Sequence, residues 1–160
     1  MMRPRAVVAC ALVIALAGGC ADGGDDDGES PSGFADEANA ICAERQSALA
    51  EWTPEDRSRD RFEPVAQAFA EEHQALEELD PPSDVEDEYL EMVDLFSGQS
   101  RHYYRVLELE RRIYDQPGPQ RDRSLDVEWR EANQDATAAG GRGRKIARDL
   151  GLESCGDAIY

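Results

Sequence analysis

The fold is decided by the stretch Phe34-Ala35-Asp36-Glu37-Ala38-Asn39-Ala40-Ile41-Cys42-Ala43-Glu44-Arg45-Gln46-Ser47-Ala48-Leu49-Ala50-Glu51-Trp52. Its apolar residues recur every three or four positions, as on one face of an α-helix: Phe34, Ala38, Ile41, Cys42, Ala48, Leu49 and Trp52. Arg45 is the only charged residue on that face. The pattern predicts an amphipathic helix that turns Cys42 toward the core.

The same spacing predicts a second helix. Thr53-Pro54 supplies an N-cap residue and a proline at the first helical position, and Asp80-Pro81-Pro82 ends the pattern. Its inward face is expected to hold Phe62, Val65, Ala66, Phe69, His73, Leu76 and Leu79.

A third helix is predicted from Ser83, which forms a capping-box pattern with Glu86, to about Tyr114. The turn sequence Gln116-Pro117-Gly118-Pro119 follows it. The expected inward stripe is Tyr89, Met92, Val93, Phe96, Tyr103, Leu107 and Tyr114.

A fourth helix is predicted from Ser124 to Leu150, with Gly151 in the left-handed conformation after its end. Gly140, Gly141 and Gly143 either weaken this helix or allow a neighbour to approach closely. Its inward residues are expected to be Leu125, Trp129, Ala132, Ala136, Ala139, Ile146 and Leu150. Four amphipathic helices with short connections predict an all-α, antiparallel bundle over residues 34–160.

The N-terminus has the pattern of an export signal. Arg3 and Arg5 precede an apolar run too short to span a bilayer, and Gly18-Gly19-Cys20 follows it. This arrangement resembles a bacterial lipobox, which implies removal of residues 1–19 and diacylation of Cys20. An ordinary secretory signal is the alternative, and it would leave the protein secreted. Residues 20–33, which are rich in Gly, Ser and Asp, are expected to form a disordered acidic tether.

Two cysteines remain once Cys10 is removed with the signal and Cys20 is lipidated: Cys42 and Cys155. In an oxidising compartment, two such thiols in a small domain usually pair. An antiparallel bundle brings the first helix near the end of the fourth, so we predict a Cys42–Cys155 disulfide. Neither residue has the Cys-X-X-Cys spacing or the adjacent histidine that favours a reactive thiolate.

The charge is strongly acidic and unevenly placed. The 160 residues include 17 basic and 35 acidic side chains, for a net charge of −18. Residues 20–100 contain 24 acidic and 4 basic side chains, whereas residues 101–160 contain 11 of each. Such a chain would repel phosphate backbones, so we expect no nucleic-acid partner.

Metal binding is the main chemical alternative. His73 and Glu77 are four residues apart on a predicted helix and could hold a metal with help from neighbouring carboxylates. The Glu-X-X-His pattern of dimetal bundles is missing, because Ala70 and Gln99 stand three residues before His73 and His102. The acidic residues from Asp84 to Asp94 lack EF-hand spacing. We therefore predict no metal site and no cofactor.

Catalytic motifs are missing too, including the Gly-X-Ser-X-Gly elbow, His-Glu-X-X-His and glycine-rich phosphate loops. An enzyme built from scattered carboxylates stays an alternative, but we expect no catalytic residues. Two further groups could form a ligand surface. These are the basic run Arg142, Arg144, Lys145 and Arg148, and the tyrosines Tyr103, Tyr104 and Tyr114 among neighbouring arginines.

Three segments carry a resemblance to a known group of proteins: residues 34–42, residues 76–82 and residues 149–156. They resemble small uncharacterised lipoproteins of high-GC Gram-positive (actinobacterial) bacteria. The resemblance implies a helical fold tied by a disulfide between its N-terminal and C-terminal parts, and it carries no catalytic residues. The predicted anchor, the tether and the missing active-site motifs favour a non-enzymatic binding or interaction module on the outer face of the cell membrane, whose partner is an envelope protein or a small ligand.

Overall fold

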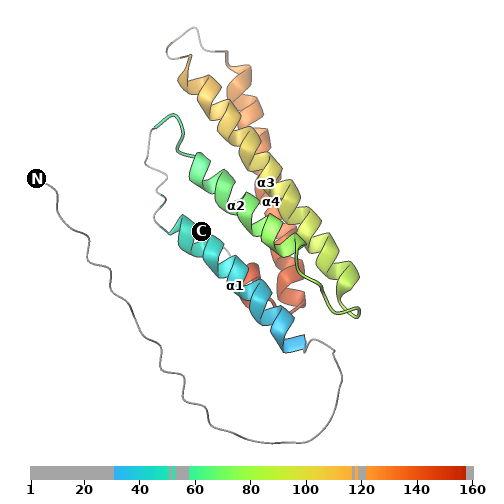
Figure 1. Cartoon of the computed structure of the whole chain (residues 1–160). Helices are drawn as coiled ribbons and strands as arrows, with labels where there is room; N and C mark the ends of the chain where they lie inside the picture. The colour runs from blue at the N-terminus through green and yellow to red at the C-terminus, as the bar shows by residue number, and fades with distance from the viewer. Residues whose placement is uncertain (1–30, 51, 53–57, 117, 119–121, 158–160) are drawn as a thin grey trace, which may run out of the picture.

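The computed structural model describes residues 31–50, 52, 58–116, 118 and 122–157. In these residues the chain forms the helices α1 (Pro31–Leu49), α2 (Glu63–Glu77), α3 (Glu86–Tyr114), α4 (Ser124–Asp149) and α5 (Glu153–Gly156). The four long helices pack side by side, and each runs antiparallel to the one before it (Figure 1). The all-α antiparallel bundle predicted from periodicity is confirmed. The short α5 was not predicted.

The start of α2 differs from the prediction. Residues 59–62 form turns, so the predicted helix is wrong over these four residues. The predicted start at Thr53-Pro54 lies outside the described residues. The turn is held by a hydrogen bond from the Glu63 amide to the Asp60 carbonyl and by Trp52 Nε1, which donates to the Arg61 carbonyl at 2.7 Å. These bonds stop the helical pattern, and α2 begins at Glu63.

The predicted capping box at the start of α3 is also wrong. The N-cap residue is Val85, and no side chain caps the helix. The amide of Val85 donates instead to the carbonyl of Pro82 at 3.0 Å, so Ser83 lies within a turn that precedes the first helical residue, Glu86. The fourth helix, α4, follows its prediction closely, and Gly151 after its end has the predicted positive φ of 76°.

Two apolar clusters form the core, one at each end of the bundle. The first surrounds the disulfide and includes Phe34, Ala38, Cys42, Leu76, Tyr89, Met92, Val93, Phe96, Ala147, Leu152 and Cys155. The second includes Leu49, Phe62, Val65, Ala66, Ala68, Phe69, Val106, Leu107, Leu109, Leu125 and Ala132. Most of the predicted inward faces are therefore confirmed.

Two predicted core positions, Ala48 and Tyr114, are exposed, and a third, His73, is only partly buried. Ala48 is exposed beside a hollow between α1 and α2, because the alanines there leave the groove between the helices unfilled. Tyr114 is 55% exposed because it is the last residue of α3. His73 is half-buried at the edge of α2 and its ring lies 3.8 Å from the exposed Glu77 carboxylate.

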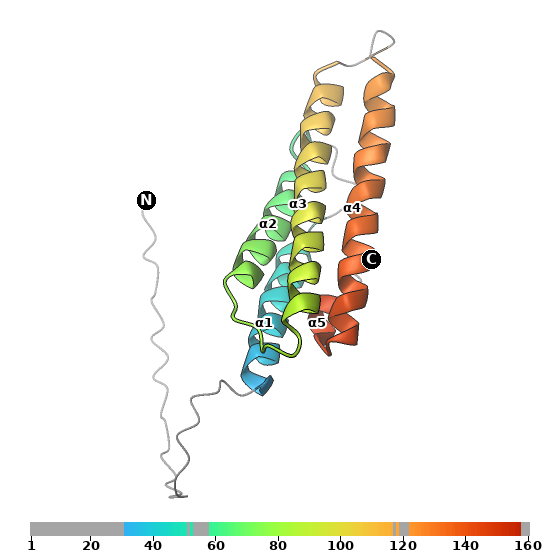
Figure 2. The same cartoon turned by 90° about the vertical axis from the view of Figure 1, so that its right-hand side faces the viewer.

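The predicted disulfide is confirmed: Cys42 and Cys155 are bonded, with their Cα atoms 5.0 Å apart. The bridge joins α1 to α5, and α5 packs against both α1 and α4 (Figure 2). Asn39 Oδ1 accepts a hydrogen bond from the Ser154 amide, and Gln46 Nε2 donates to the Ser154 carbonyl. The C-terminal segment is thus fastened to α1 by one covalent bond and two hydrogen bonds.

The α3–α4 packing depends on glycines of α4. A Cβ atom at Gly143 would lie 2.6 Å from the Phe96 ring, and one at Gly140 would overlap the Gln99 amide. The predicted close approach of a neighbour is therefore confirmed at these two positions. It does not occur at Gly141, which is exposed and where an added Cβ atom would meet no other atom within 4 Å. Of the residues described, none belongs to a helix long and apolar enough to cross a membrane.

Candidate functional site

A layer of polar side chains separates the two apolar clusters, and all four long helices contribute to it. The layer consists of Arg45, Glu72, Gln99, Ser100 and Arg144. We call it the polar layer. Polar groups in a bundle core are costly unless they are paired, so such a layer is the first place to look for a function.

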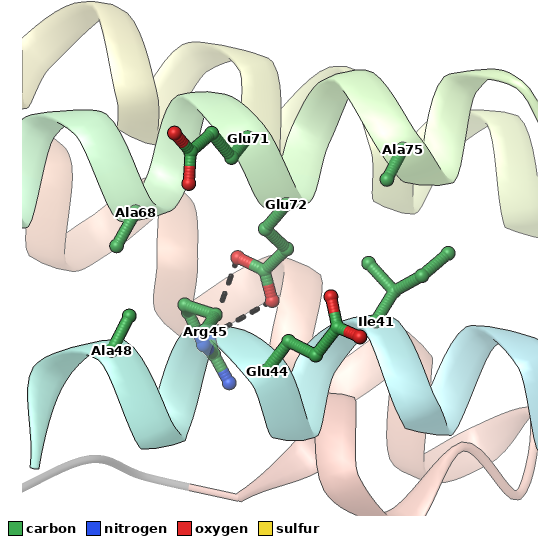
Figure 3. Close-up of a pocket in the computed structure, with 8 residues that line it drawn as sticks. All are labelled: Ile41, Glu44, Arg45, Ala48, Ala68, Glu71, Glu72 and Ala75. Carbon is green, nitrogen blue, oxygen red and sulfur yellow. Dashed lines mark hydrogen bonds and ion pairs between the residues drawn. The ribbon is translucent and has the colours of Figure 1, made fainter. Parts of the chain in front are cut away.

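The centre of the polar layer is an ion pair between α1 and α2. Arg45 Nη1 lies 3.2 Å from Glu72 Oε1 and 3.5 Å from Oε2, and both side chains are 0% exposed. The guanidinium also lies over the Phe69 ring, 5.5 Å from its centre. Figure 3 shows the two side chains reaching toward each other from the facing helices.

A hollow of about 210 Å³ lies over this ion pair, between α1 and α2. Its lining is small and apolar except for the ion pair and two exposed carboxylates at its rim: Ile41, Glu44, Arg45, Ala48, Ala68, Glu71, Glu72 and Ala75 (Figure 3). Water does not reach the Arg45 or Glu72 side chains. The pair therefore lies in the floor of the hollow, and the exposed carboxylates of Glu44 and Glu71 are the polar groups at its rim.

Burial dominates the electrostatics of Glu72. It raises the pKa of this carboxyl from 4.5 to about 7, and the positive charges of Arg45 and Arg144 oppose the rise. The pKa of Tyr103 is raised as well, again mainly by burial, while a hydrogen bond with Gln99 and the two arginines act in the opposite direction. The amide oxygen Oε1 of Gln99 has no hydrogen-bond partner among the described residues.

The polar layer therefore has a structural role. The buried Arg45–Glu72 pair fixes the register of α1 relative to α2. A shift of one helix along the other would separate the two side chains and leave a buried charge unpaired. Sequence reasoning does not single out Glu72. The available signal is its position three residues after Phe69 and four before Leu76, which places it on the inward face of α2, opposite a helix whose own inward face carries a cation.

A second hollow, of about 180 Å³, lies between α2 and α3 at the end of the bundle where α1 begins. It is lined by His73, Glu77, Leu79, Tyr89, Leu90, Val93, Asp94 and Ser97. Tyr89 Oη donates to the Leu76 carbonyl at 2.7 Å, so it is not available to a ligand. In the described part of the chain, no three histidine, cysteine or acidic side chains come together as metal ligands, here or elsewhere.

The other candidate surfaces are largely used within the monomer. Lys145 pairs with Asp149 at 2.6 Å, and Arg148 donates to the Gly156 carbonyl. Tyr103 stacks on Phe69 inside the core, with ring centres 4.8 Å apart. Tyr103 is therefore lost from the tyrosine groove that the sequence suggested, and two members of the basic run, Lys145 and Arg148, have partners within the chain. Cys20, the predicted lipidation residue, lies outside the described residues.

One surface stands apart from these internal contacts. We call it the α3 outer face: Leu90, Asp94, Ser97, Arg101 and Tyr104, which recur every three or four residues along the solvent side of α3. Leu90 is 53% exposed and Tyr104 is 49% exposed, which makes them two of the most exposed large apolar side chains described. Leu90 and Tyr104 flank the exposed charged side chains of Asp94 and Arg101 on this face.

Comparison of the chain with protein-family models, with curated proteins and with solved structures finds no match.

Proposed function

We propose that this protein is an extracytoplasmic interaction module without enzymatic activity, held at the outer face of the cell membrane by a lipid on Cys20. The address is supported by the export-signal pattern before Cys20 and by the Cys42–Cys155 disulfide, a bond that persists in oxidising compartments. A lipid anchor with two acyl chains holds a protein far longer than one chain does.

The α3 outer face carries the interaction role in this proposal. The Arg45–Glu72 pair at the centre of the polar layer is sealed from solvent, so these two charges cannot recognise a partner. The α3 outer face instead offers half-exposed Leu90 and Tyr104 together with the exposed charges of Asp94 and Arg101. Aromatic and aliphatic side chains flanked by charges are the usual anchors and orienting groups of protein interfaces.

The anchor is tested with the full-length chain in cells fed a fatty-acid probe. The wild type should incorporate the probe and fractionate with membranes, and Cys20→Ala should lose the label and either stay uncleaved or appear in the medium. Wild-type protein that never incorporates the probe would overturn the anchored address.

The interaction role is tested by placing a photo-reactive amino acid at Tyr104 of the membrane-bound protein. The matched control is Val127 on α4, which is 46% exposed. Cross-linked products from position 104 and not from position 127 are the expected result. Equal products from both positions, or none from either, would refute the assignment of the α3 outer face.

A further inference from the structure

The two charged side chains of the α3 outer face have no ion-pair partner among the residues that the structure describes. Asp94 makes no hydrogen bond or ion pair in the described part of the chain, and Arg101 there bonds only to Ser97 Oγ, through Nη1 at 2.6 Å. Asp94 and Arg101 are seven residues apart, or roughly 10 Å along a helix, so they share one face without reaching each other.

This face is self-complementary. The midpoint between Asp94 and Arg101 falls between Ser97 and Gly98, and Leu90 and Tyr104 lie almost symmetrically about the same point. We propose that two copies of the chain associate through their α3 outer faces, antiparallel, about a two-fold axis beside Ser97 and Gly98. This names the partner for the interaction role proposed above, and it rests on that role.

The antiparallel arrangement forms every contact twice. Asp94 of one copy lies opposite Arg101 of the other, and Leu90 lies opposite Tyr104, as an isologous interface requires. Ser97, the residue at the centre of the face, is small and allows the two helices to approach closely. The hollow beside Leu90, about 180 Å³, lies where the Tyr104 ring of the second copy would pack.

Charge decides the direction of the pairing. No lysine or arginine occurs between Phe62 and Ser100, so the charged side chains in the N-terminal half of α3 are all acidic. The C-terminal half carries four arginines (Arg101, Arg105, Arg111 and Arg112) and two glutamates (Glu108 and Glu110), so its net charge is positive. A parallel pairing would place acidic halves together and repel, whereas the antiparallel pairing sets each acidic half against a basic one.

Disulfide trapping tests the position of the axis. Ser97→Cys in the full-length, membrane-bound protein should give a covalent dimer on mild oxidation, because the two Ser97 positions meet near the axis. Gln134→Cys, on the exposed side of α4, is the matched control and should not cross-link. Absence of the Ser97→Cys dimer, or an equal yield from Gln134→Cys, would overturn the proposal.

Charge reversal tests the contacts themselves, in the Ser97→Cys background. Asp94→Arg or Arg101→Asp alone should slow cross-linking about tenfold, since two surface ion pairs are lost and repulsion replaces them. The double change should restore the rate, and Asp135→Arg on α4 should leave it unaltered. A double variant as slow as the single ones would refute the pairing. If the photo-reactive residue at position 104 instead cross-links to a different protein, the proposed interaction role stands and the proposed dimer is wrong.

Discussion

Removing the charge of Glu72 should change how stability depends on pH. The carboxyl lies in the polar layer with a pKa raised by burial to about 7, against 4.5 for an ordinary glutamate, despite the attraction of Arg45 and Arg144. A pKa raised by folding means that the folded state binds the proton more tightly than the unfolded state does. The stabilisation is therefore complete below pH 4.5 and is lost as pH rises through 7.

The size of the effect follows from the shift. Each pKa unit corresponds to 1.36 kcal/mol, so this group should remove about 3 kcal/mol from the free energy of unfolding between pH 4.5 and pH 8. The variant Glu72→Gln lacks this titration. The difference in free energy of unfolding between Glu72→Gln and the wild type should therefore shift by about 3 kcal/mol in favour of the variant as pH rises from 4.5 to 8.

Urea unfolding at several pH values between 4.5 and 8, with the disulfide intact, measures this difference. Glu71→Gln is the matched control because it removes the same charge from the exposed side of the same helix. A wild type that becomes more stable relative to Glu72→Gln as pH rises would refute the reasoning, since it would mean that the attraction of Arg45 outweighs the cost of burial.

Replacing the pair by Arg45→Met with Glu72→Leu should be neutral or stabilising at pH 8, by up to about 4 kcal/mol.

Three further outcomes are expected. Cys155→Ser should lower the free energy of unfolding by about 2 to 5 kcal/mol in chemical denaturation, because the disulfide no longer links two residues that are 113 positions apart in the chain. An unchanged denaturation midpoint would contradict this. Gly143→Ala should cost about 1 to 3 kcal/mol because its methyl group meets the Phe96 ring, whereas Gly141→Ala, with open space around it, should stabilise α4 slightly; equal effects in thermal melts would show that the close approach is unimportant. The purified full-length protein should hold no stoichiometric zinc, copper or iron by elemental analysis, and His73→Ala should alter stability alone; metal retained by the wild type and lost in that variant would favour the metal-handling alternative.

Helical periodicity was sufficient for most of the fold. The alternation of apolar and polar residues places Cys42 and Leu49 inside α1 and Phe69 and Leu76 inside α2, because burial of one stripe is what stabilises an amphipathic helix. Local start signals were less informative. Ser83 has the right neighbours for a capping box, but a backbone bond between Val85 and Pro82 closes a turn first, and the sequence pattern alone does not weigh these two options.

The sequence by itself determined the four long helices and most of their inward faces, and it predicted the pairing of Cys42 with Cys155, because each depends on local periodicity or on counting residues. Only the tertiary structure decided that Arg45 meets Glu72 across 27 positions of sequence, and that Asp94 and Arg101 lie on one solvent face with no ion-pair partner among the described residues. Charged side chains take their partners from whichever helix lies beside them. Neighbours of that kind are set by how the helices pack, and the periodicity of a single helix does not contain that information.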